Sequence, residues 1–270
     1  MLSFSSATVS LVLLLLPLVH GQTSTKCQPL NGTCPPDTAL GTSHEFNFNS
    51  STVLSQGFNT SIGTVGYGGN GLEFTVAQKG DMPTVISNFY IFWGSVSVVM
   101  RAAQGQGIIS TIVLLSDDLD EVDWEMMGGN GTYAESNYFG KGNTTSYDRA
   151  QYHPVSSDLR DNFHNYTTHW NSSQLEWWID GSLVRTLQYG DALGGANYPQ
   201  TPMTVRMGIW AGGDPSEPAG TISWAGGTTN YADGPFTMYV QSATVTDFSS
   251  GSQYEYGDRS GSWQSIKTIA

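Results

Sequence analysis

Short stretches with alternating hydrophobic and polar residues run through most of the chain, and glycine-rich turns separate them. In residues 94–102 and 203–210, for example, every second residue is apolar. This period of two is typical of a β-strand with one buried face, and almost no stretch shows the longer period of a helix. We therefore predict an all-β fold with strands at residues 45–49, 71–77, 89–93, 94–102, 108–115, 121–127, 167–171, 175–179, 184–189, 203–210 and 236–245.

The spacing of these strands predicts how they are arranged. Asp180-Gly181 joins two of them and supplies the positive backbone angles that a tight hairpin turn needs. Closely spaced strands without intervening helices favour a sandwich of two antiparallel sheets. We see no internal repeat or linker, and predict one domain over residues 22–250 with a Ser/Gly-rich, loosely packed tail at residues 251–270.

The N-terminal region indicates secretion. An apolar run from Leu11 to Val19 is followed by Gly21, which predicts a signal peptide over residues 1–21. The run is too short to span a bilayer, so we expect no membrane insertion. Cys27 and Cys34 are then expected to form a local disulfide in an oxidising compartment. Seven N-x-Ser/Thr sequons are candidate glycosylation sites, at Asn31, Asn49, Asn59, Asn130, Asn143, Asn165 and Asn171.

Charge and missing motifs exclude several classes of function. The chain has 10 Lys and Arg against 23 Asp and Glu, a formal charge of -13, which disfavours nucleic acids and anionic membranes as partners. The sequence contains no phosphate-binding glycine loop, no G-x-S-x-G motif and no clustered Cys and His residues. We therefore expect a neutral substrate, no metal or other cofactor, and a monomer.

The segment around residues 121–125 is the clearest candidate for chemistry. On a strand, Glu121, Asp123 and Glu125 would share one face, while Val122 and Trp124 would point into the core. Three acidic side chains in a row repel one another and have poor strand propensity, so a fold tolerates them mainly for function. The structural alternative is a solvated acidic face or a calcium site. For Asp117, Asp118 and Asp120, a solvated turn or a modest cation site is the favoured interpretation.

Two glutamates at this spacing suit a retaining glycosidase. Their Cα atoms would lie roughly 13 Å apart on a strand, but side chains that lean together can bring the carboxyl groups to about 5 to 6 Å. That separation allows direct attack on the sugar without a bridging water. One glutamate must be ionised and the other protonated, and their mutual repulsion helps to keep these states apart.

These residues also resemble a known family. The run from Glu121 to Glu125 is similar to the E-[IV]-D-x-E signature of glycoside hydrolase family 16, whose members have a concanavalin-like β-jelly-roll fold with a concave substrate groove. The cysteine pair before Pro35-Pro36 and the runs at residues 137–142, 210–215 and 224–227 resemble the fungal Crh-type cell-wall transglycosylases. The resemblance implies Glu121 as nucleophile, Asp123 as helper and Glu125 as acid/base.

Further residues are predicted to bind substrate. Alternation in residues 203–210 puts Arg206 and Trp210 on the face opposite the apolar one, although burial in the core is an alternative for both. Thr221 and Trp224 follow a Gly/Pro-rich segment and are expected to border the groove from a loop. Tyr138, Phe139 and Lys141 are candidates for a loop wall, with a plain packed loop as the alternative.

The N-terminal region predicts a secreted protein, and the resemblance implies an enzyme that cleaves chitin and transfers the chain to a β-glucan or chitin acceptor in the cell wall. The nearest alternative is a hydrolytic endo-β-glucanase or chitinase of the same fold. The alternative from another class is a non-catalytic glycan-binding module, which would need Trp210 and Trp224 but not Glu121.

Overall fold

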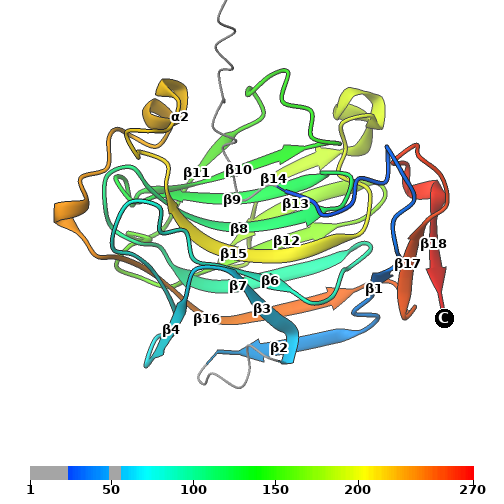
Figure 1. Ribbon diagram of the computed structural model, residues 1–270, viewed down its shortest axis with the longest axis horizontal. Helices are drawn as coiled ribbons and strands as arrows, with labels where there is room; N and C mark the ends of the chain where they lie inside the picture. The colour runs from blue at the N-terminus through cyan, green and yellow to red at the C-terminus, as the bar shows by residue number, and fades with distance from the viewer. Residues whose placement is uncertain (1–23, 49–55) are drawn as a thin grey trace, which may run out of the picture.

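Two antiparallel β-sheets packed face to face form the body of the protein (Figure 1). The structure is a computed structural model that describes residues 24–48 and 56–270. It confirms the predicted all-β sandwich. The predicted signal peptide at residues 1–21 and the sequon at Asn49 lie outside the described residues. In the described part of the chain, no helix is both long and apolar enough to cross a membrane.

The first sheet, here called the groove sheet, carries the acidic strand. Its strand order is β11-β10-β9-β8-β15-β6-β3. The strands are β3 (Phe58–Ile62), β6 (Thr84–Ser87), β8 (Ile108–Ser116), β9 (Glu121–Met127), β10 (Tyr133–Phe139), β11 (Gln151–Pro154) and β15 (Met203–Ala211).

The second sheet covers the other side of the core and has the order β14-β13-β12-β7-β16-β5-β4, with β2 also paired to β16. Its strands are β2 (Ser43–Asn47), β4 (Val65–Gly68), β5 (Gly71–Val76), β7 (Gly94–Arg101), β12 (His164–Trp170), β13 (Gln174–Ile179), β14 (Ser182–Gln188) and β16 (Phe236–Asp247). The predicted hairpin is confirmed, because β13 and β14 are joined at Asp180 and Gly181, whose φ angles are 49° and 77°.

Apolar side chains from both sheets meet in one core. From β9, Val122, Trp124 and Met126 point inward and are at most 1% exposed. The ring of Trp124 lies 5.4 Å from that of Tyr166 on β12. The indole N–H of Trp177 on β13 donates a hydrogen bond to the backbone carbonyl of Asp123 at 3.2 Å. The second sheet therefore fixes the position of the acidic strand from behind.

A small third sheet corrects the predicted loose tail. It has the order β1-β17-β18, from β1 (Asp37–Thr38), β17 (Gln253–Tyr256) and β18 (Ile266–Ile269), and lies at one end of the sandwich (Figure 1). Tyr254 is fully buried, and Trp263 packs against the core. The expectation of loose packing was wrong, because it rested on the overall Ser/Gly content and not on the two aromatic residues that pack against the core.

The predicted strand at residues 89–93 is also wrong. Its apolar residues Phe89, Ile91 and Phe92 are buried, but the backbone makes only isolated bridges, from Tyr90 and Ile91. Trp93 then turns the chain with a φ of 61°. The remaining elements are short: α2 (Ala219–Trp224), η1 (Tyr189–Asp191), η2 (Leu193–Gly195), η3 (Tyr231–Asp233) and η4 (Trp263–Ser265).

Candidate active site

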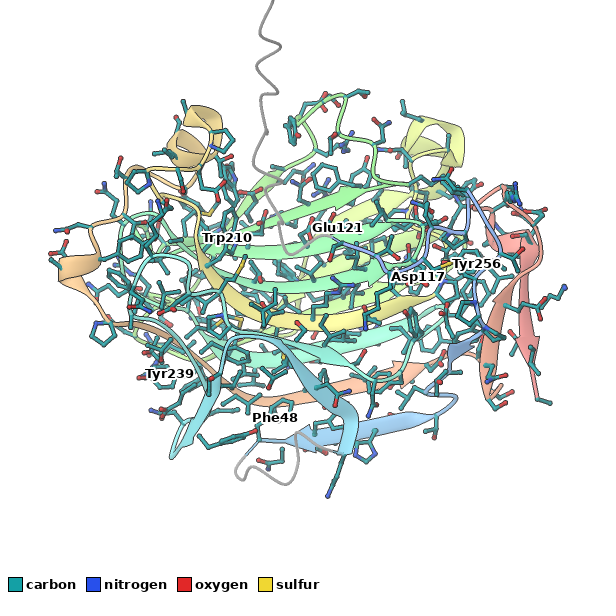
Figure 2. All side chains as sticks on the ribbon, viewed as in Figure 1. Phe48, Asp117, Glu121, Trp210, Tyr239 and Tyr256 are labelled. Carbon is teal, nitrogen blue, oxygen red and sulfur yellow. A yellow bond between two sulfur atoms is a disulfide. The ribbon has the colours of Figure 1, made fainter. Side chains whose placement is uncertain are left out.

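Three carboxyl groups from β9 lie together in a groove on the outer face of the groove sheet. Glu121, Asp123 and Glu125 all line this groove, whereas the residues between them are buried in the core. The predicted alternation is therefore confirmed. Figure 2 places Glu121 near the middle of the sheet, with Trp210 toward α2 and Asp117 toward the three-stranded sheet.

The neighbouring strand β10 adds Glu135 and Asn137, which the sequence analysis missed, beside Phe139, which it predicted for a wall of the groove. In its register with β9, Glu135 lies opposite Glu125, Asn137 opposite Asp123, and Phe139 opposite Glu121. All three also line the groove. We expected a loop in this region, and the run from Ala134 to Phe139 shows no apolar–polar alternation that would have indicated a strand.

The groove is large enough for several sugar rings. Its volume is about 890 Å³, near the upper end of the range for ligand sites. Its walls come from the loop after β10 and from the segment around α2. The lining residues are Val113, Leu119, Glu121, Asp123, Glu125, Glu135, Asn137, Phe139, Gly142, Thr144, Tyr147, Ala150, Trp210, Pro218, Gly220, Thr221 and Trp224.

Burial and mutual repulsion favour the neutral form of two of these carboxyl groups. The pKa of Asp123 is raised well above its ordinary value by burial, by the charges of Glu121 and Glu125, and by a hydrogen bond to Glu121. The pKa of Glu125 is also raised well above its ordinary value, by burial and then by the charges of Glu135 and Glu121. Both shifts favour the protonated forms of Asp123 and Glu125.

Two tryptophans form one wall of the groove. Trp210 extends from β15, and Trp224 comes from α2; their rings are stacked with centroids 6.1 Å apart and an interplanar angle of 27°. The Trp224 indole N–H donates a 2.9 Å hydrogen bond to Glu135 Oε2. Thr221 lies three residues before Trp224 on the same short helix and also faces the groove. The predicted segment is thus a helical turn rather than a plain loop, and it places Thr221 and Trp224 at the groove beside Trp210 of β15.

Arg206 lies on the outer face of β15 but not among the residues that line the groove. Its Nε donates to Thr204 Oγ1 at 3.3 Å, and its Nη2 donates to the Ser24 carbonyl at 3.3 Å. The side chain also interacts electrostatically with Glu121 and Asp117. Its predicted contact with substrate stays a prediction.

The structure does not place Tyr138 and Lys141 in the groove. Tyr138 is only 6% exposed and points into the core, 6.5 Å from the ring of Trp177. The physical reason is that Tyr138 belongs to β10, where its neighbours Asn137 and Phe139 take the outer face. Lys141 follows the end of β10, has a φ of 52°, and is not among the residues that line the groove. Its backbone N–H donates to Asp120 Oδ1 at 2.9 Å.

Two of the three aspartates before β9 are buried rather than solvated, while Asp117 is partly exposed. Asp118 and Asp120 are fully buried, and Thr201 Oγ1 donates to them at 2.6 and 2.9 Å respectively. Asp120 Oδ2 also accepts the Gln200 backbone N–H at 2.7 Å. These carboxyl groups tie the β8–β9 turn to the segment before β15. Among residues 24–48 and 56–270, no group of three or more His, Cys, Asp or Glu side chains could hold a metal ion.

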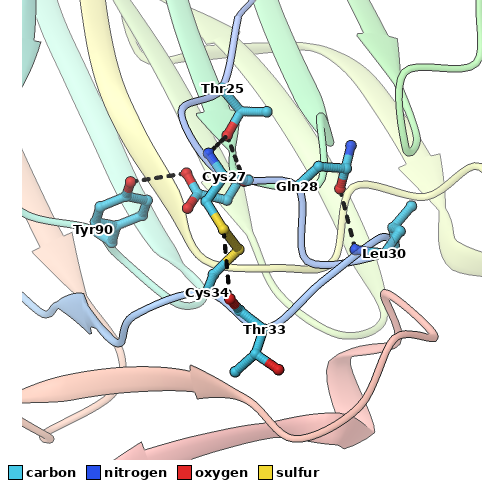
Figure 3. The surroundings of a disulfide bond; sticks show 8 residues. Thr25, Cys27, Gln28, Leu30, Thr33, Cys34 and Tyr90 are labelled. Carbon is cyan, nitrogen blue, oxygen red and sulfur yellow. Dashed lines mark hydrogen bonds between the residues drawn. A yellow bond between two sulfur atoms is a disulfide. The ribbon is translucent and has the colours of Figure 1, made fainter.

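The predicted disulfide is present between Cys27 and Cys34 (Figure 3). It closes a short loop near Tyr90, whose hydroxyl donates to Asp117 Oδ1 at 3.0 Å. Two of the sequon asparagines accept a hydrogen bond from the threonine of their own sequon. Asn130 Oδ1 accepts from the hydroxyl of Thr132, and Asn143 Oδ1 accepts from that of Thr145, both at 2.7 Å. Glycosylation stays a prediction.

Comparison with known proteins gives consistent matches. The model of glycosyl hydrolases family 16 matches residues 54–226. Crh-like protein 2 of Botryotinia fuckeliana is 59% identical over 97% of this chain, and Crh-like protein 5 of Aspergillus fumigatus is 52% identical over 96%. The chain spans only 59% and 66% of the lengths of these two relatives.

A solved structure gives a similarly close match. Crh5 transglycosylase in complex with NAG has a TM-score of 0.87 and 52% sequence identity, and the alignment covers 90% of this chain and all of that one. The predicted jelly-roll fold is confirmed by this likeness.

Proposed function

The chain belongs to glycosyl hydrolase family 16, and we propose that it is a retaining transglycosylase that acts on β-linked glycans. The observation that carries the proposal is the row of Glu121, Asp123 and Glu125 on the floor of an open groove with a tryptophan wall. An ionised nucleophile and a protonated acid on one strand are what a double displacement needs.

In the first step, a Glu121 carboxylate oxygen forms a bond to the anomeric carbon while the bond to the leaving sugar breaks. Glu125 gives its proton to the departing oxygen, so the leaving chain acquires a free hydroxyl. In the second step, ionised Glu125 takes a proton from an acceptor hydroxyl, whose oxygen displaces Glu121 from the same carbon. Two inversions restore the original β configuration.

The surroundings of the carboxyl groups support these roles. The raised pKa of Glu125 favours its protonated form, as an acid requires. Protonated Asp123 can donate its hydrogen bond to Glu121 and hold that carboxylate in place without adding a charge beside it.

For the substrates, we propose chitin as donor and β-glucan or chitin as acceptor. A similar protein of solved structure is called a transglycosylase and was solved with NAG. The stacked Trp210 and Trp224 offer apolar faces for pyranose rings. The disulfide supports an oxidising, extracellular location such as the cell wall. For the oligomeric state, a monomer stays our prediction.

The proposal is tested with a chitin oligosaccharide donor and a fluorescent glucan oligosaccharide acceptor, whose products are separated by size. Wild-type protein should give longer labelled products, and Glu121→Gln should reduce their yield by roughly a thousandfold or more. Glu45→Gln is the matched control, because Glu45 lies exposed on β2 and should leave transfer unchanged.

Other outcomes point to the alternatives. A shortened donor without a labelled adduct would indicate a hydrolase of the same fold. Retained binding of chitin oligosaccharide with no turnover in wild type would reject the enzyme in favour of a glycan-binding module.

A further inference from the structure

A fourth carboxyl group in the groove, Glu135, lies directly across from Glu125. The two residues are paired in the β9–β10 register, and Tyr152 on β11 follows opposite Glu135. Side chains opposed in this way have Cβ atoms about 4.5 to 5.5 Å apart. Glu125 therefore has two acidic neighbours on its own strand, Asp123 and Glu121, and a third, Glu135, on the adjacent strand.

Glu135 is built into the site rather than exposed to water. The residue is 0% exposed, and its Oε2 accepts the Trp224 indole N–H at 2.9 Å. Its Oε1 is buried without a hydrogen-bond partner within the described residues. The pKa of Glu135 is raised overall by burial, although the N–H of Trp224, the hydroxyl of Tyr152 and the charge of Arg185 each lower it in part; among the described residues Glu125 has no such opposing contacts, and its pKa is raised well above its ordinary value.

The polar surroundings of Glu135 differ from those of Glu125. Three neighbours favour the ionised form of Glu135, whereas the charges of Glu135 and Glu121 both favour the protonated form of Glu125. Other titratable and charged groups surround Glu125 and Glu135. They are Glu121 and Asp123 on β9, Tyr133 on β10, Tyr152 on β11 and Arg185 on β14. Arg206 on β15 interacts with the charge of Glu121. The short helix α2 contributes only the neutral Trp224.

We propose that Glu135 is a positioning residue for the acid: its carboxylate, held by Trp224, keeps the reacting proton on Glu125. Two carboxyl groups this close do not ionise together easily, so a charge fixed on one retains the proton on the other. The same charge assists the second step, because it makes Glu125 a stronger base toward the acceptor hydroxyl. This inference rests on the proposed role of Glu125 as acid/base.

The test replaces the charge while keeping the hydrogen bond. In Glu135→Gln, the amide oxygen can still accept from Trp224, but Glu125 loses its charged neighbour and should lose its proton at lower pH. The alkaline limb of the kcat/KM profile for chitin oligosaccharide cleavage should move to lower pH. The ratio of variant to wild-type rates should fall about tenfold from the acidic to the alkaline side.

Two further variants separate this role from a structural one. Glu135→Asp keeps the charge and should keep the position of the limb even if the rate falls. Glu73→Gln, on β5 in the second sheet, is the control and should match wild type. A loss of rate in Glu135→Gln that is equal at every pH would overturn the inference, because a packing defect does not change protonation.

A second readout does not depend on activity. Infrared spectra of wild type minus Glu125→Gln isolate the carboxyl stretch of Glu125, whose loss with pH can be followed by titration. The midpoint should fall in the Glu135→Gln background. An unchanged midpoint would refute the inference about Glu135, whereas an inactive wild type with a shifted midpoint would refute only the proposed function.

Discussion

At the scale of single residues, burial decides the protonation of carboxyl groups even outside the groove. Asp37 on β1 is only 6% exposed, and its Oδ2 has no hydrogen-bond partner within the described residues. Burial, followed by the charges of Asp117 and Asp118, raises its pKa from 3.8 to about 8. Asp37 therefore stays largely protonated below about pH 8, but it has no place in the reaction.

This raised pKa predicts how stability depends on pH. The folded state binds a proton at Asp37 that the unfolded chain releases above its ordinary pKa, so the free energy of unfolding falls as pH rises from 3.8 to about 8. Asp37→Asn cannot titrate and should lose less stability over this range. Urea unfolding at pH 5 and pH 8.5 measures the difference.

The control for this prediction is Asp233→Asn, because Asp233 is exposed at the end of η3. It should keep the wild-type dependence on pH. If Asp37→Asn keeps it as well, the Asp37 carboxyl is ionised in the folded protein and the predicted direction is wrong.

At the scale of elements, the turn after β9 holds the acidic strand against its neighbours. Gly128 donates its backbone N–H to the Ile108 carbonyl at 2.8 Å, and its carbonyl accepts from Gly105 at 3.0 Å. A Cβ at Gly128 would lie only 2.5 Å from the Gly105 carbonyl oxygen. Glycine is needed here for close approach of two backbone segments, not for an unusual φ angle.

Gly128→Ala should therefore destabilise the protein by about 1 to 3 kcal/mol, because the backbone around the added methyl group must move. The neighbouring Gly129 is a matched control, since a Cβ there would meet its nearest atom at 3.7 Å. Thermal unfolding of the two variants should show a large loss for Gly128→Ala and a small change for Gly129→Ala. Equal losses would mean that the close contact does not limit the fold.

At the scale of the whole molecule, the three-stranded sheet joins the two ends of the described chain to the sandwich. β1 pairs with β17, and β17 pairs with β18. The Tyr254 hydroxyl donates to Asp247, which also accepts the backbone N–H groups of Gly41 and Phe92 at 2.9 and 3.1 Å. Residues far apart in sequence thus share one buried carboxylate.

Removal of residues 251–270 should therefore lower the free energy of unfolding by at least about 3 kcal/mol, from the loss of buried Tyr254 and of the packing around Trp263. Urea unfolding of the truncated chain measures this cost. Removal of Ala270 alone, which is exposed, is the control. A truncated chain as stable as the full one would show that the third sheet adds nothing to the body.

Local features of this fold could be predicted from the amino-acid sequence alone. Alternation gave the faces of β7, β9 and β15, because a period of two is written directly in the order of residues. The same rule placed Glu121, Asp123 and Glu125 on one face, and Asp180-Gly181 was enough to predict the hairpin. The resemblance of residues 121–125 to a family signature added the fold and the proposed chemistry.

Which strands are neighbours, and in what register they pair, could be learned only from the folded structure, because strand pairing depends on contacts between segments that are distant in sequence. It brought Glu135 beside Glu125 and Trp224 onto Glu135, and it turned Tyr138 into the core. It also buried Asp118 and Asp120, and packed a tail whose Ser/Gly-rich composition predicted looseness. In each case the free energy of a side chain depends on partners that lie far away in sequence, and a local pattern cannot supply them.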